Sequence, residues 1–309
     1  MALAELALRL AERLCQLRQL RPSEQQQHDE QDDEELGSPD GTHGSRAYRY
    51  PAAILGPVLE CVVNVSEGRR PSVIDALAEA AGADLLDLHV DAGHHRSVLT
   101  LAGVDAPRRV AVAAVSRIDL RRHRGIHPRL GAIDVVPFVP LDGSTMEDAI
   151  EARDAFVQWS PVPCLRYGPD GSSLPELRRS ARTMTTLLPH PTAGITAVGA
   201  RSVLVAYNVW LDDESLRTAR GIAAAVRSPA VRTLGMALPG GIQVSMNLVD
   251  PTTFGPADAY DAVASRARVA RAELVGLLPR AVLDAVDESR WNQLDLSPDR
   301  TIEARFTRV

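Results

Sequence analysis

The densest group of side chains that could do chemistry is the segment R-R-H-R-G-I-H-P-R at residues 121–129. His123 and His127 are four residues apart, so on a helix they would share one face and could hold zinc. Gly125 and Pro128 disfavour a continuous helix, and no third ligand stands at a recognisable spacing. The alternative is a loop histidine among arginines, whose positive charge favours the neutral imidazole that a general base requires.

Two other segments combine polar side chains with flexible backbone. The first is D-A-G-H-H-R-S at residues 91–97, and the second is P-T-A-G-I-T-A-V-G-A-R at residues 191–201. Gly194 and Gly199 would allow the backbone of the second segment to approach a flat ligand closely. Glycines and polar residues are also ordinary in surface turns, so the spacing alone leaves both interpretations open.

The elements that would position these segments begin near Val58, where V-L-E-C-V-V-N-V is typical of a buried strand. A helix follows between Pro71 and Gly82, since proline is tolerated in a first helical turn and glycine ends helices. A-D-L-L-D-L-H-V and H-R-S-V-L-T-L-A-G then predict a hairpin, Asp105 caps a helix through Ile118, and A-I-D-V-V-P-F-V-P-L is another strand. The order β-α-β-β-α-β is that of a ferredoxin-like unit.

The second half repeats this order with different residues. S-V-L-V-A-Y-N-V-W-L is a strand, a helix runs from Asp212 or Asp213 to about Val226, and V-R-T-L-G-M-A-L and I-Q-V-S-M-N-L-V-D form a hairpin. A helix from about Pro256 to Arg271 and a short strand, E-L-V-G-L-L-P, complete the repeat.

Asn64 and Asn208 occupy matching places in the two leading strands, V-V-N-V and A-Y-N-V, which hints at two related lobes. We therefore predict an α/β (α+β) fold of two similar ferredoxin-like lobes with a cleft between them. Residues 51–144 are assigned to the first lobe and residues 145–309 to the second. The tail that Trp291 leads is predicted to be a final strand or arm.

Residues 1–50 differ in composition from this body. Residues 1–21 carry leucines at spacings of three and four, which predicts an amphipathic helix. Residues 22–50 are polar and acidic, which is typical of a disordered linker. The leading helix is either a segment for partner binding or self-association, or a poorly ordered appendage, because so short a helix is marginal in water by itself.

Composition excludes several classes of function. The net charge is −6 and no basic patch dominates, which argues against a nucleic-acid partner. The three cysteines are far apart with no C-x-x-C spacing, which argues against disulfides or a cysteine metal site and fits a reducing cytosol. No apolar run reaches the ~18 residues that a membrane span needs, and charges interrupt the leucine-rich N-terminus, so neither a membrane anchor nor a signal peptide is expected.

Five motifs together resemble one known family. They are E-C-V-V-N-V-S-E-G-R (60–69), D-x-x-x-x-R-S-V (91–98), I-D-L-R-R-H-R-G-I-H-P-R-L-G-A-I-D-V-V-P-F-V-P (118–140), T-A-V-G-A-R (196–201) and A-E-L-V-G-L-L-P (272–279). Over about residues 58–285 the chain resembles the glutamate formimidoyltransferase family, and the H-P-R-x-G-A-x-D-V-x-P-F segment is its longest and most specific match. The resemblance implies a cytoplasmic, commonly dimeric transferase of histidine degradation that moves a formimidoyl group from N-formimidoyl-L-glutamate to N5 of tetrahydrofolate, without a metal.

The resemblance also implies roles for particular residues. The family's catalytic histidine is His127 here, and it acts as general acid and base. The family's folate-contacting segment corresponds to Pro191, Thr192, Ala193 and Gly194. Because both substrates carry carboxylates, arginines should line the cleft. The expected substrate-binding residues are Arg96, Arg129, Arg201 and Asn64.

The chain also departs from the family's pattern. Ile126 stands where the family usually has glutamate, His95 replaces an asparagine in the hairpin, and the folate-contacting stretch is shortened at residues 178–195. The chain ends at Val309, so a cyclodeaminase domain is not expected. The alternatives to a folate-dependent transferase are therefore a repurposed, non-catalytic relative that binds a small molecule or a partner protein, and an amidine hydrolase that uses water in place of folate.

Overall fold

The computed structural model describes most of the chain beyond residue 57. The described residues all belong to one compact unit, residues 38–309. They are residues 58–125, 129–141, 143–181, 184, 187–212 and 214–306. The expected helix over residues 1–21, the expected linker over 22–50 and His127 itself lie outside them.

The first lobe contains the predicted β-α-β-β-α-β order, followed by further elements. Its elements are β1 (Leu59–Val65), α3 (Pro71–Ala81), the 3-10 turn η1 (Gly82–Asp84), β2 (Leu85–Asp91), β3 (Arg96–Ala102), α4 (Asp105–Arg117), β4 (Ile133–Pro140), α5 (Met146–Trp159), β5 (Cys164–Tyr167), α6 (Leu174–Ala181) and β6 (Thr196–Ala200). Gly82 ends α3 with a φ of 64°, and a capping box at Thr145 begins α5.

The strands of the first lobe form a six-stranded sheet in the order β2-β3-β1-β4-β6-β5. The first four strands pair antiparallel, whereas β4, β6 and β5 run parallel. Because β5 and β6 extend this sheet, the residues as far as Ala200 belong to it. The sequence predicts the second lobe over residues 145–309, whereas residues 145–200 add strands to the first sheet, and the change from one sheet to the other falls between β6 and the next strand.

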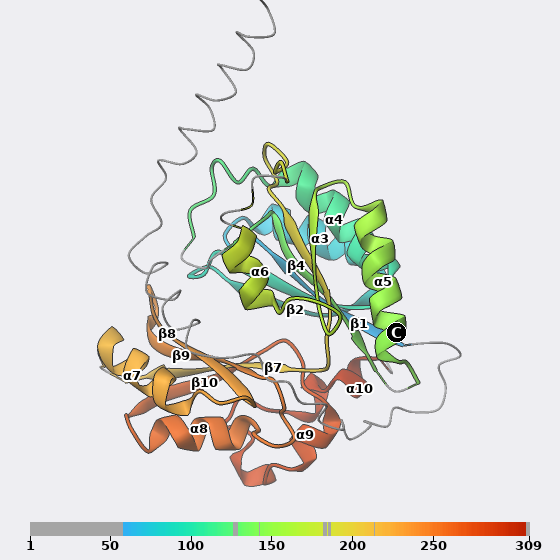
Figure 1. Cartoon of the computed structure of the whole chain (residues 1–309). Coiled ribbons are helices and arrows are strands. Elements are labelled where there is room, and N and C mark those ends of the chain that lie inside the picture. Colours follow the sequence, from blue (N-terminus) through green and yellow to red (C-terminus); the bar gives the residue numbers. More distant parts are fainter. Residues whose placement is uncertain are drawn as a thin grey trace, which may run out of the picture. The chain divides into compact units, whose positions relative to one another are not determined.

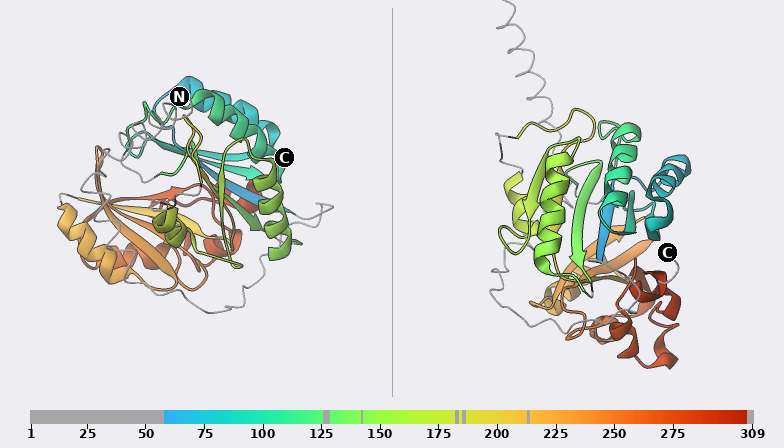
Figure 2. Two further views of the ribbon diagram at one scale, coloured as in Figure 1. Left: turned by 45° about the horizontal axis from the view of Figure 1, so that its top comes forward. Right: turned by 90° about the vertical axis from the view of Figure 1, so that its right-hand side faces the viewer.

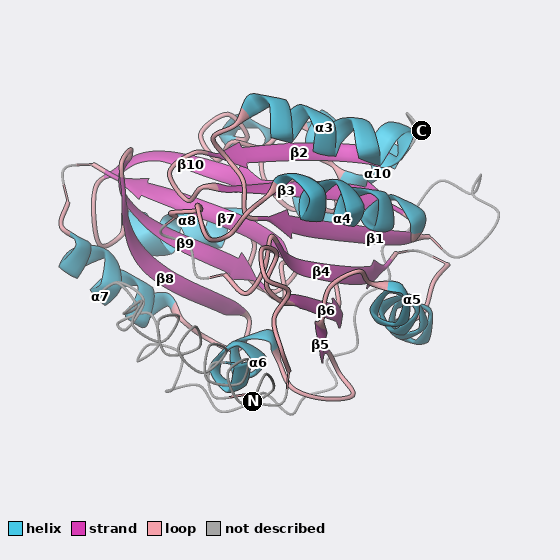
Figure 3. Ribbon diagram, turned by 90° about the horizontal axis from the view of Figure 1, so that it is seen from above, coloured by secondary structure: helices cyan, strands magenta, loops and turns pink. Residues whose placement is uncertain are grey.

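Alternation along β1 separates the two faces of this sheet. Cys61, Val63 and Val65 are buried in a core with α3 and α4, so Asn64 projects from the opposite face. The helices α3 and α4 lie over β1, β2 and β3 (Figure 3). The sheet face that carries Asn64 is therefore free of these helices.

The second lobe has the same order of elements and the same order of strands as the first four strands of the first lobe. Its sheet is ordered β10-β7-β9-β8 and is antiparallel throughout. Its elements are β7 (Val205–Leu211), α7 (Leu216–Val226), β8 (Val231–Leu238), β9 (Gly241–Leu248), α8 (Pro256–Ala264) and β10 (Val269–Val275). The helices α7 and α8, in orange in Figure 2, pack on this sheet (Figures 1 and 2).

Three boundaries in this half differ from the prediction. The helix α8 ends at Ala264 and β10 begins at Val269, because alternation in V-A-R-A-E-L-V buries Ala272 and Leu274 on one face. The helix α7 begins later than expected because the Ser215 side chain, and not Asp212, caps it.

After β10 the chain forms α9 (Arg280–Asp284) and the 3-10 turn η2 (Glu288–Arg290). The tail from Trp291, expected to be a final strand or arm, has no strand among its described residues and forms the 3-10 turn η3 (Pro298–Arg300) and α10 (Ile302–Phe306). The last helix packs Ile302 into a cluster with Val58, Leu86 and Val139 of the first sheet. None of the helices in the described part of the chain has the length and apolar content needed to cross a membrane.

Candidate active site

The turn after β1 holds a buried carboxylate. Glu67 is fully buried, and its Oε1 accepts hydrogen bonds from the backbone N–H groups of Gly68, Arg69 and Arg70 at 3.1, 2.8 and 3.0 Å. Burial alone would raise the pKa of Glu67, but these N–H groups and the Arg70 guanidinium lower it below its ordinary value. The carboxylate thus sits at the start of α3, where the helix dipole favours negative charge, and its role is structural.

Gly68 fits this turn against the β2–β3 hairpin. A Cβ on Gly68 would collide with the backbone of Asp91 and Arg96, so only glycine allows the two segments to lie so close. The Gly68 N–H donates to His95 Nδ1 at 3.1 Å, and the Ser97 hydroxyl donates to the Glu67 carbonyl. The S-E-G motif therefore positions the hairpin tip.

The hairpin tip, residues 91–96, is itself constrained. Asp91 Oδ2 lies 2.5 Å from His94 Nδ1, and Asp91 Oδ1 accepts from the His94 backbone N–H at 2.8 Å. Burial raises the pKa of Asp91, but the hydrogen bonds and charge of His94 outweigh it and lower the pKa to about 2. His95 adopts a φ of 55°, a left-handed conformation that is uncommon for residues other than glycine, although asparagine, aspartate and histidine adopt it more often than the rest. Such strain is typical of functional sites.

His95 stacks on His123 from the loop that follows α4. The ring centroids are 4.1 Å apart with an angle of 24° between the planes, and His123 Nε2 lies 3.1 Å from the His95 carbonyl oxygen. Burial and the charge of Arg129 lower the pKa of His123 to about 4. Burial, offset in part by Glu67, also lowers the pKa of His95. Both rings are therefore neutral near pH 7.

The two ends of the segment around His127 are held in place. A Cβ on Gly125 would lie 2.9 Å from both His123 Cε1 and the His94 carbonyl oxygen, so Gly125 packs directly on the tip. On the other side Gly131 packs against the backbone of Ile195, and the Ser66 hydroxyl donates a hydrogen bond to the Gly131 carbonyl at 2.7 Å. Residues 126–128, with His127, lie outside the described residues, but the residues that flank them meet β1, the hairpin tip and the segment before β6.

The predicted folate-contacting segment forms a tight turn beside this loop. The Ala132 N–H donates to the Ala193 carbonyl and the Leu120 N–H donates to the Thr192 carbonyl, each at 2.8 Å. Ala193 is buried, and Gly194, with a φ of 72°, packs on the Leu130 carbonyl oxygen. Pro191 is exposed and Thr192 is half-buried. Packing within the protein therefore accounts for the glycine at position 194, and of the four predicted residues only Ala193 is buried, with 1% exposed.

Packing also accounts for the other glycine of that segment. The space beside Gly199 is filled by the Tyr167 ring of β5, which lies next to β6 in the sheet. The sequence had suggested that Gly194 and Gly199 make room for a flat ligand. The structure instead uses both glycines for contact between neighbouring segments.

Two of the predicted arginines come together near a buried carboxylate. Burial lowers the pKa of Arg129, and it lowers the pKa of Arg96 to about 10. The negative charge of Asp134, only 1% exposed, opposes the lowering in both arginines. Arg178 of α6 joins them, because its Nη2 lies 2.6 Å from Asp134 Oδ2. No motif in the sequence pointed to Arg178, since its partner is 44 positions away along the chain.

Arg201 lies elsewhere. Its backbone N–H donates to the Phe138 carbonyl, near the C-terminal end of β4, whereas Arg129 precedes the start of that strand. The seven steps from Ile133 to Pro140 span roughly 23 Å. Arg201 instead acts on buried Glu60, whose pKa burial raises to about 7 while the Arg201 charge opposes the rise. The structure therefore does not bring Arg201 to Arg96 and Arg129.

Asn64 lies on the face of the first sheet that is free of α3 and α4. Its Nδ2 donates to the Val62 carbonyl at 3.1 Å, and in the sheet it is paired with Val98 of β3 and Val135 of β4. It is thus near the end of β1 that leads to Glu67. The counterpart Asn208 donates to Glu273 Oε2 at 3.1 Å on the second sheet.

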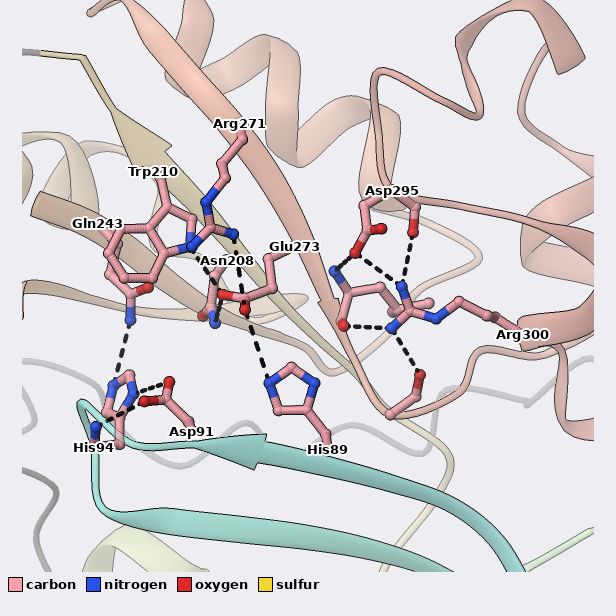
Figure 4. Close-up of polar contacts among 12 residues, drawn as sticks. His89, Asp91, His94, Asn208, Trp210, Gln243, Arg271, Glu273, Asp295 and Arg300 are labelled. Carbon is pink, nitrogen blue, oxygen red and sulfur yellow. Dashed lines mark hydrogen bonds and ion pairs between the residues drawn. The ribbon is translucent and has the colours of Figure 1, made fainter. Parts of the chain in front are cut away.

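Residues of the second lobe reach the hairpin of the first (Figure 4). Gln243 Nε2 lies 3.3 Å from His94 Nε2, and Glu273 Oε1 lies 3.8 Å from His89 Nε2. Glu273 also accepts from the Trp210 indole N–H at 2.8 Å. Alternation along β9 and β10 could have placed Gln243 and Glu273 on one face, but nothing in the sequence distinguished that face from a solvated one.

The described residues offer no metal centre. Within the described ranges, no three His, Cys, Asp or Glu side chains are grouped as ligands for an ion.

The fold and the site together define a two-lobed α/β protein with neutral histidines and clustered arginines around one loop of its first lobe. Similarity to known proteins identifies the family of the chain. The formiminotransferase domain, N-terminal subdomain, matches residues 58–201. Glutamate formimidoyltransferase of Streptococcus pyogenes serotype M1 is 33% identical over 279 residues, which cover 75% of this chain and 93% of that protein.

Two further relatives extend this result. Glutamate formimidoyltransferase of Thermoplasma acidophilum is 33% identical over 273 residues, covering 73% of this chain and 89% of that protein. Formimidoyltransferase-cyclodeaminase of Sus scrofa is 32% identical over 282 residues, which cover 75% of this chain and 52% of that protein. The chain belongs to the formimidoyltransferase family, whose members are transferases.

Proposed function

We propose that this protein transfers a formimidoyl group from N-formimidoyl-L-glutamate to N5 of tetrahydrofolate, with His127 as general acid and base. The observation that carries the proposal is the anchoring of the loop on both sides of His127, through Gly125 on the hairpin tip and Gly131 on Ile195. A group that moves protons in a transition state must be held near one position. The names of the similar proteins from Streptococcus pyogenes and Thermoplasma acidophilum support the same reaction.

Arg96 and Arg129 are assigned to the carboxylates of the substrates. Both guanidiniums lie near Asp134 at the end of the sheet where the His127 loop begins and ends. Guanidinium is suited to this role because its fork of N–H groups matches a carboxylate in two parallel hydrogen bonds. Arg178 would support them by sharing Asp134. Asn64, on the same sheet face, would contribute a neutral polar contact.

Tetrahydrofolate would supply N5 as the nucleophile for the amidine carbon. The turn at residues 190–194 partly fits such a ligand, because exposed Pro191 and half-buried Thr192 lie beside the loop while Ala193 and Gly194 are taken up by packing. His127 would accept the proton released from the attacking nitrogen and deliver one to the departing glutamate amine. Proton transfer of this kind contributes ~10²- to 10⁴-fold to a rate.

We propose that the protein works in the cytoplasm, in histidine breakdown or a related one-carbon step, and as a homodimer, which is what the resemblance to the family implies. Sedimentation of the purified full chain tests the dimer.

The experiment that tests the function combines binding with turnover. Tetrahydrofolate is titrated calorimetrically into the full-length protein, and N-formimidoyl-L-glutamate is then added while the 5,10-methenyl product is followed after acid treatment. Saturable folate binding with product formation supports the transferase. Turnover without folate would indicate an amidine hydrolase. No folate binding up to millimolar concentration would mean that the shortened segment at 178–195 has lost the folate site.

A further inference from the structure

His123 presents a hydrogen-bonding atom that nothing in the described structure uses. Its side chain is almost entirely buried, with 6% of the residue exposed, and Nδ1 is a buried atom with no hydrogen-bond partner among the described residues. Buried polar atoms in folded proteins nearly always have a partner. An unpartnered one beside a candidate active site is therefore a signal of a ligand.

The other atoms of the ring determine what kind of partner Nδ1 needs. His123 Nε2 lies 3.1 Å from the His95 carbonyl oxygen, which can only accept, so Nε2 carries the proton. Burial and the nearby Arg129 charge lower the pKa of His123 to about 4, so the ring is neutral near pH 7. A neutral ring with a proton on Nε2 has a bare Nδ1. This atom is an acceptor and requires a donor.

The ring cannot easily turn to change this arrangement. It stacks on His95 at 4.1 Å, and its Cε1 lies against Gly125, where a Cβ would be 2.9 Å away. Gly125 is two residues before His127, so the bare Nδ1 belongs to the loop that is assigned to proton transfer. Arg129 Nη2 donates to the His123 carbonyl at 3.3 Å and holds the other side of the residue.

We propose that His123 determines donor specificity, by accepting a hydrogen bond at Nδ1 from an N–H of the amidine group that is transferred. This inference rests on the proposed function and identifies the amidine N–H as the substrate group that His123 recognises. An amidine offers N–H donors in either of its protonation states. A formyl group has a carbonyl oxygen in the same place, and that oxygen would meet the lone pair of Nδ1 with no proton between them.

The first test compares two substitutions with two donors. His123→Gln keeps a donor toward the His95 carbonyl and lacks the acceptor at the Nδ1 position, whereas His123→Asn can place an amide oxygen near that position. The measurement is kcat/KM for N-formimidoyl-L-glutamate relative to N-formyl-L-glutamate at saturating tetrahydrofolate. Loss of one such hydrogen bond is worth about 10- to 100-fold in discrimination.

We expect the parent protein to prefer the formimidoyl donor, His123→Gln to lose about 10- to 100-fold of that preference, and His123→Asn to retain most of it. The change should fall mainly on the formimidoyl donor. An unchanged ratio of kcat/KM in His123→Gln, with folding intact by circular dichroism, would overturn the proposal.

The second test does not depend on turnover or on a folded variant. Nitrogen-15 NMR of the imidazole rings in the full-length parent protein reports whether each ring nitrogen is bare, hydrogen-bonded or protonated. Adding N-formimidoyl-L-glutamate without folate should move the His123 Nδ1 signal from the bare position toward the hydrogen-bonded one, and N-formyl-L-glutamate should not.

These outcomes separate the two proposals. A shift of the Nδ1 signal in a protein that shows no transfer would support His123 as an amidine acceptor while the transferase function fails. Transfer without any shift at saturating donor would leave the function and overturn the role of His123. A signal that is already at the hydrogen-bonded position without ligand would show a water or the loop itself as partner, and would also overturn it.

Discussion

The two lobes share the same order of elements and of strands, yet their connecting segments differ in length and in the residues that they carry. In the first lobe the connection from α4 to β4 spans residues 118–132 and carries His123, His127 and Arg129, whereas the matching connection from α8 to β10 spans only residues 265–268. The hairpin tips differ in the same way, with histidines and an arginine at 91–96 and only Pro239 and Gly240 in the second lobe. The candidate catalytic and substrate-binding residues thus lie mainly in the connections, and the shared topology does not by itself provide them in the second lobe.

The second lobe contributes through the face of its sheet. Asn208, Gln243 and Glu273 project from the face opposite to its own core, and two of them reach the first hairpin. If His127 is the catalytic residue, the first lobe holds the reacting loop and the second lobe supports it, and substitutions in the first lobe should have larger effects on turnover than equivalent ones in the second.

The largest expected effect is on His127. His127→Ala should lower kcat by ~10²- to 10⁴-fold, because the general acid and base is lost, with little change in the free energy of unfolding. The matched control is Arg266→Ala in the corresponding connection of the second lobe, which should leave kcat within experimental error. Steady-state kinetics and urea unfolding provide both measurements. Comparable losses in the two variants would break the contrast between the lobes.

The second prediction contrasts two glycines. Gly68→Ala should destabilise the protein by about 1–3 kcal/mol, because the added Cβ would collide with the backbone of Asp91 and Arg96. Gly221 of α7 has nothing within 4 Å of its Cβ position, so Gly221→Ala should instead stabilise by about 0.8 kcal/mol through helix propensity. Urea unfolding of both variants gives the values. A neutral Gly68→Ala would mean that the hairpin tip yields easily and is not held by this turn.

The third prediction concerns pH. The pKa of His123 is lowered to about 4 from an ordinary value near 6.5, so between these values the unfolded chain binds more protons than the folded one. The stabilising contribution is complete above pH 6.5 and is lost as the pH falls toward 4, by on the order of 3 kcal/mol. The lowered pKa of His95 also makes the folded protein less stable as the pH falls. The lowered pKa of Glu67 changes the free energy of unfolding only below about pH 4.5.

Glu67 does not titrate between pH 6.5 and 5, but Glu60, whose pKa burial raises to about 7, binds a proton in the folded state and opposes the histidines in this window. The comparison with His123→Gln cancels Glu60 and isolates His123. As the pH falls from 6.5 to 5, the free energy of unfolding in urea should change in a more destabilising direction in the parent protein than in His123→Gln, because the variant lacks the depressed group at position 123. An identical slope in both proteins would contradict the assignment of the effect to His123.

Much of the fold could be predicted from the sequence because its signals are local. Pro71 and Gly82 bound α3, and alternation in β1 places Asn64 opposite the core, as periodicity alone indicates. The attachment of β5 and β6 to the first sheet could not be predicted, since parallel pairing of Ala197 with Val135 joins residues distant along the chain. Local periodicity carries no information about which sheet a strand joins.

The sequence motifs name candidate site residues, but they do not give the arrangement of those residues in space. The motifs pointed to Arg96, Arg129 and the turn at 191–194, which do flank one loop, but they also included Arg201, which register places at the far end of β4. Gly194 was expected to make room for a ligand, whereas it makes room for Leu130. Such distinctions depend on which atoms fill a space, and residue types at a spacing do not specify them.

The smallest expected effect tests the support that the second lobe gives. Gln243 is fully buried and its Nε2 lies 3.3 Å from His94 Nε2, while its Oε1 has no partner among the described residues. Gln243→Leu would remove one hydrogen bond and also one unpaired acceptor, so the free energy of unfolding should change by no more than about 1 kcal/mol. Asn247→Leu, at an exposed position on the same strand, is the matched control.

Turnover is the more informative measurement for Gln243. The backbone of His94 packs on Gly125, which precedes His127 by two residues. If Gln243 holds the hairpin tip in position, Gln243→Leu should therefore displace the loop that carries His127. We expect kcat to fall several-fold with little change in the free energy of unfolding. A normal kcat in Gln243→Leu would mean that Gly68 and the Asp91–His94 pair hold the tip without help. The second lobe would then contribute surface to the substrates, and the position of the catalytic loop would be a property of the first lobe alone.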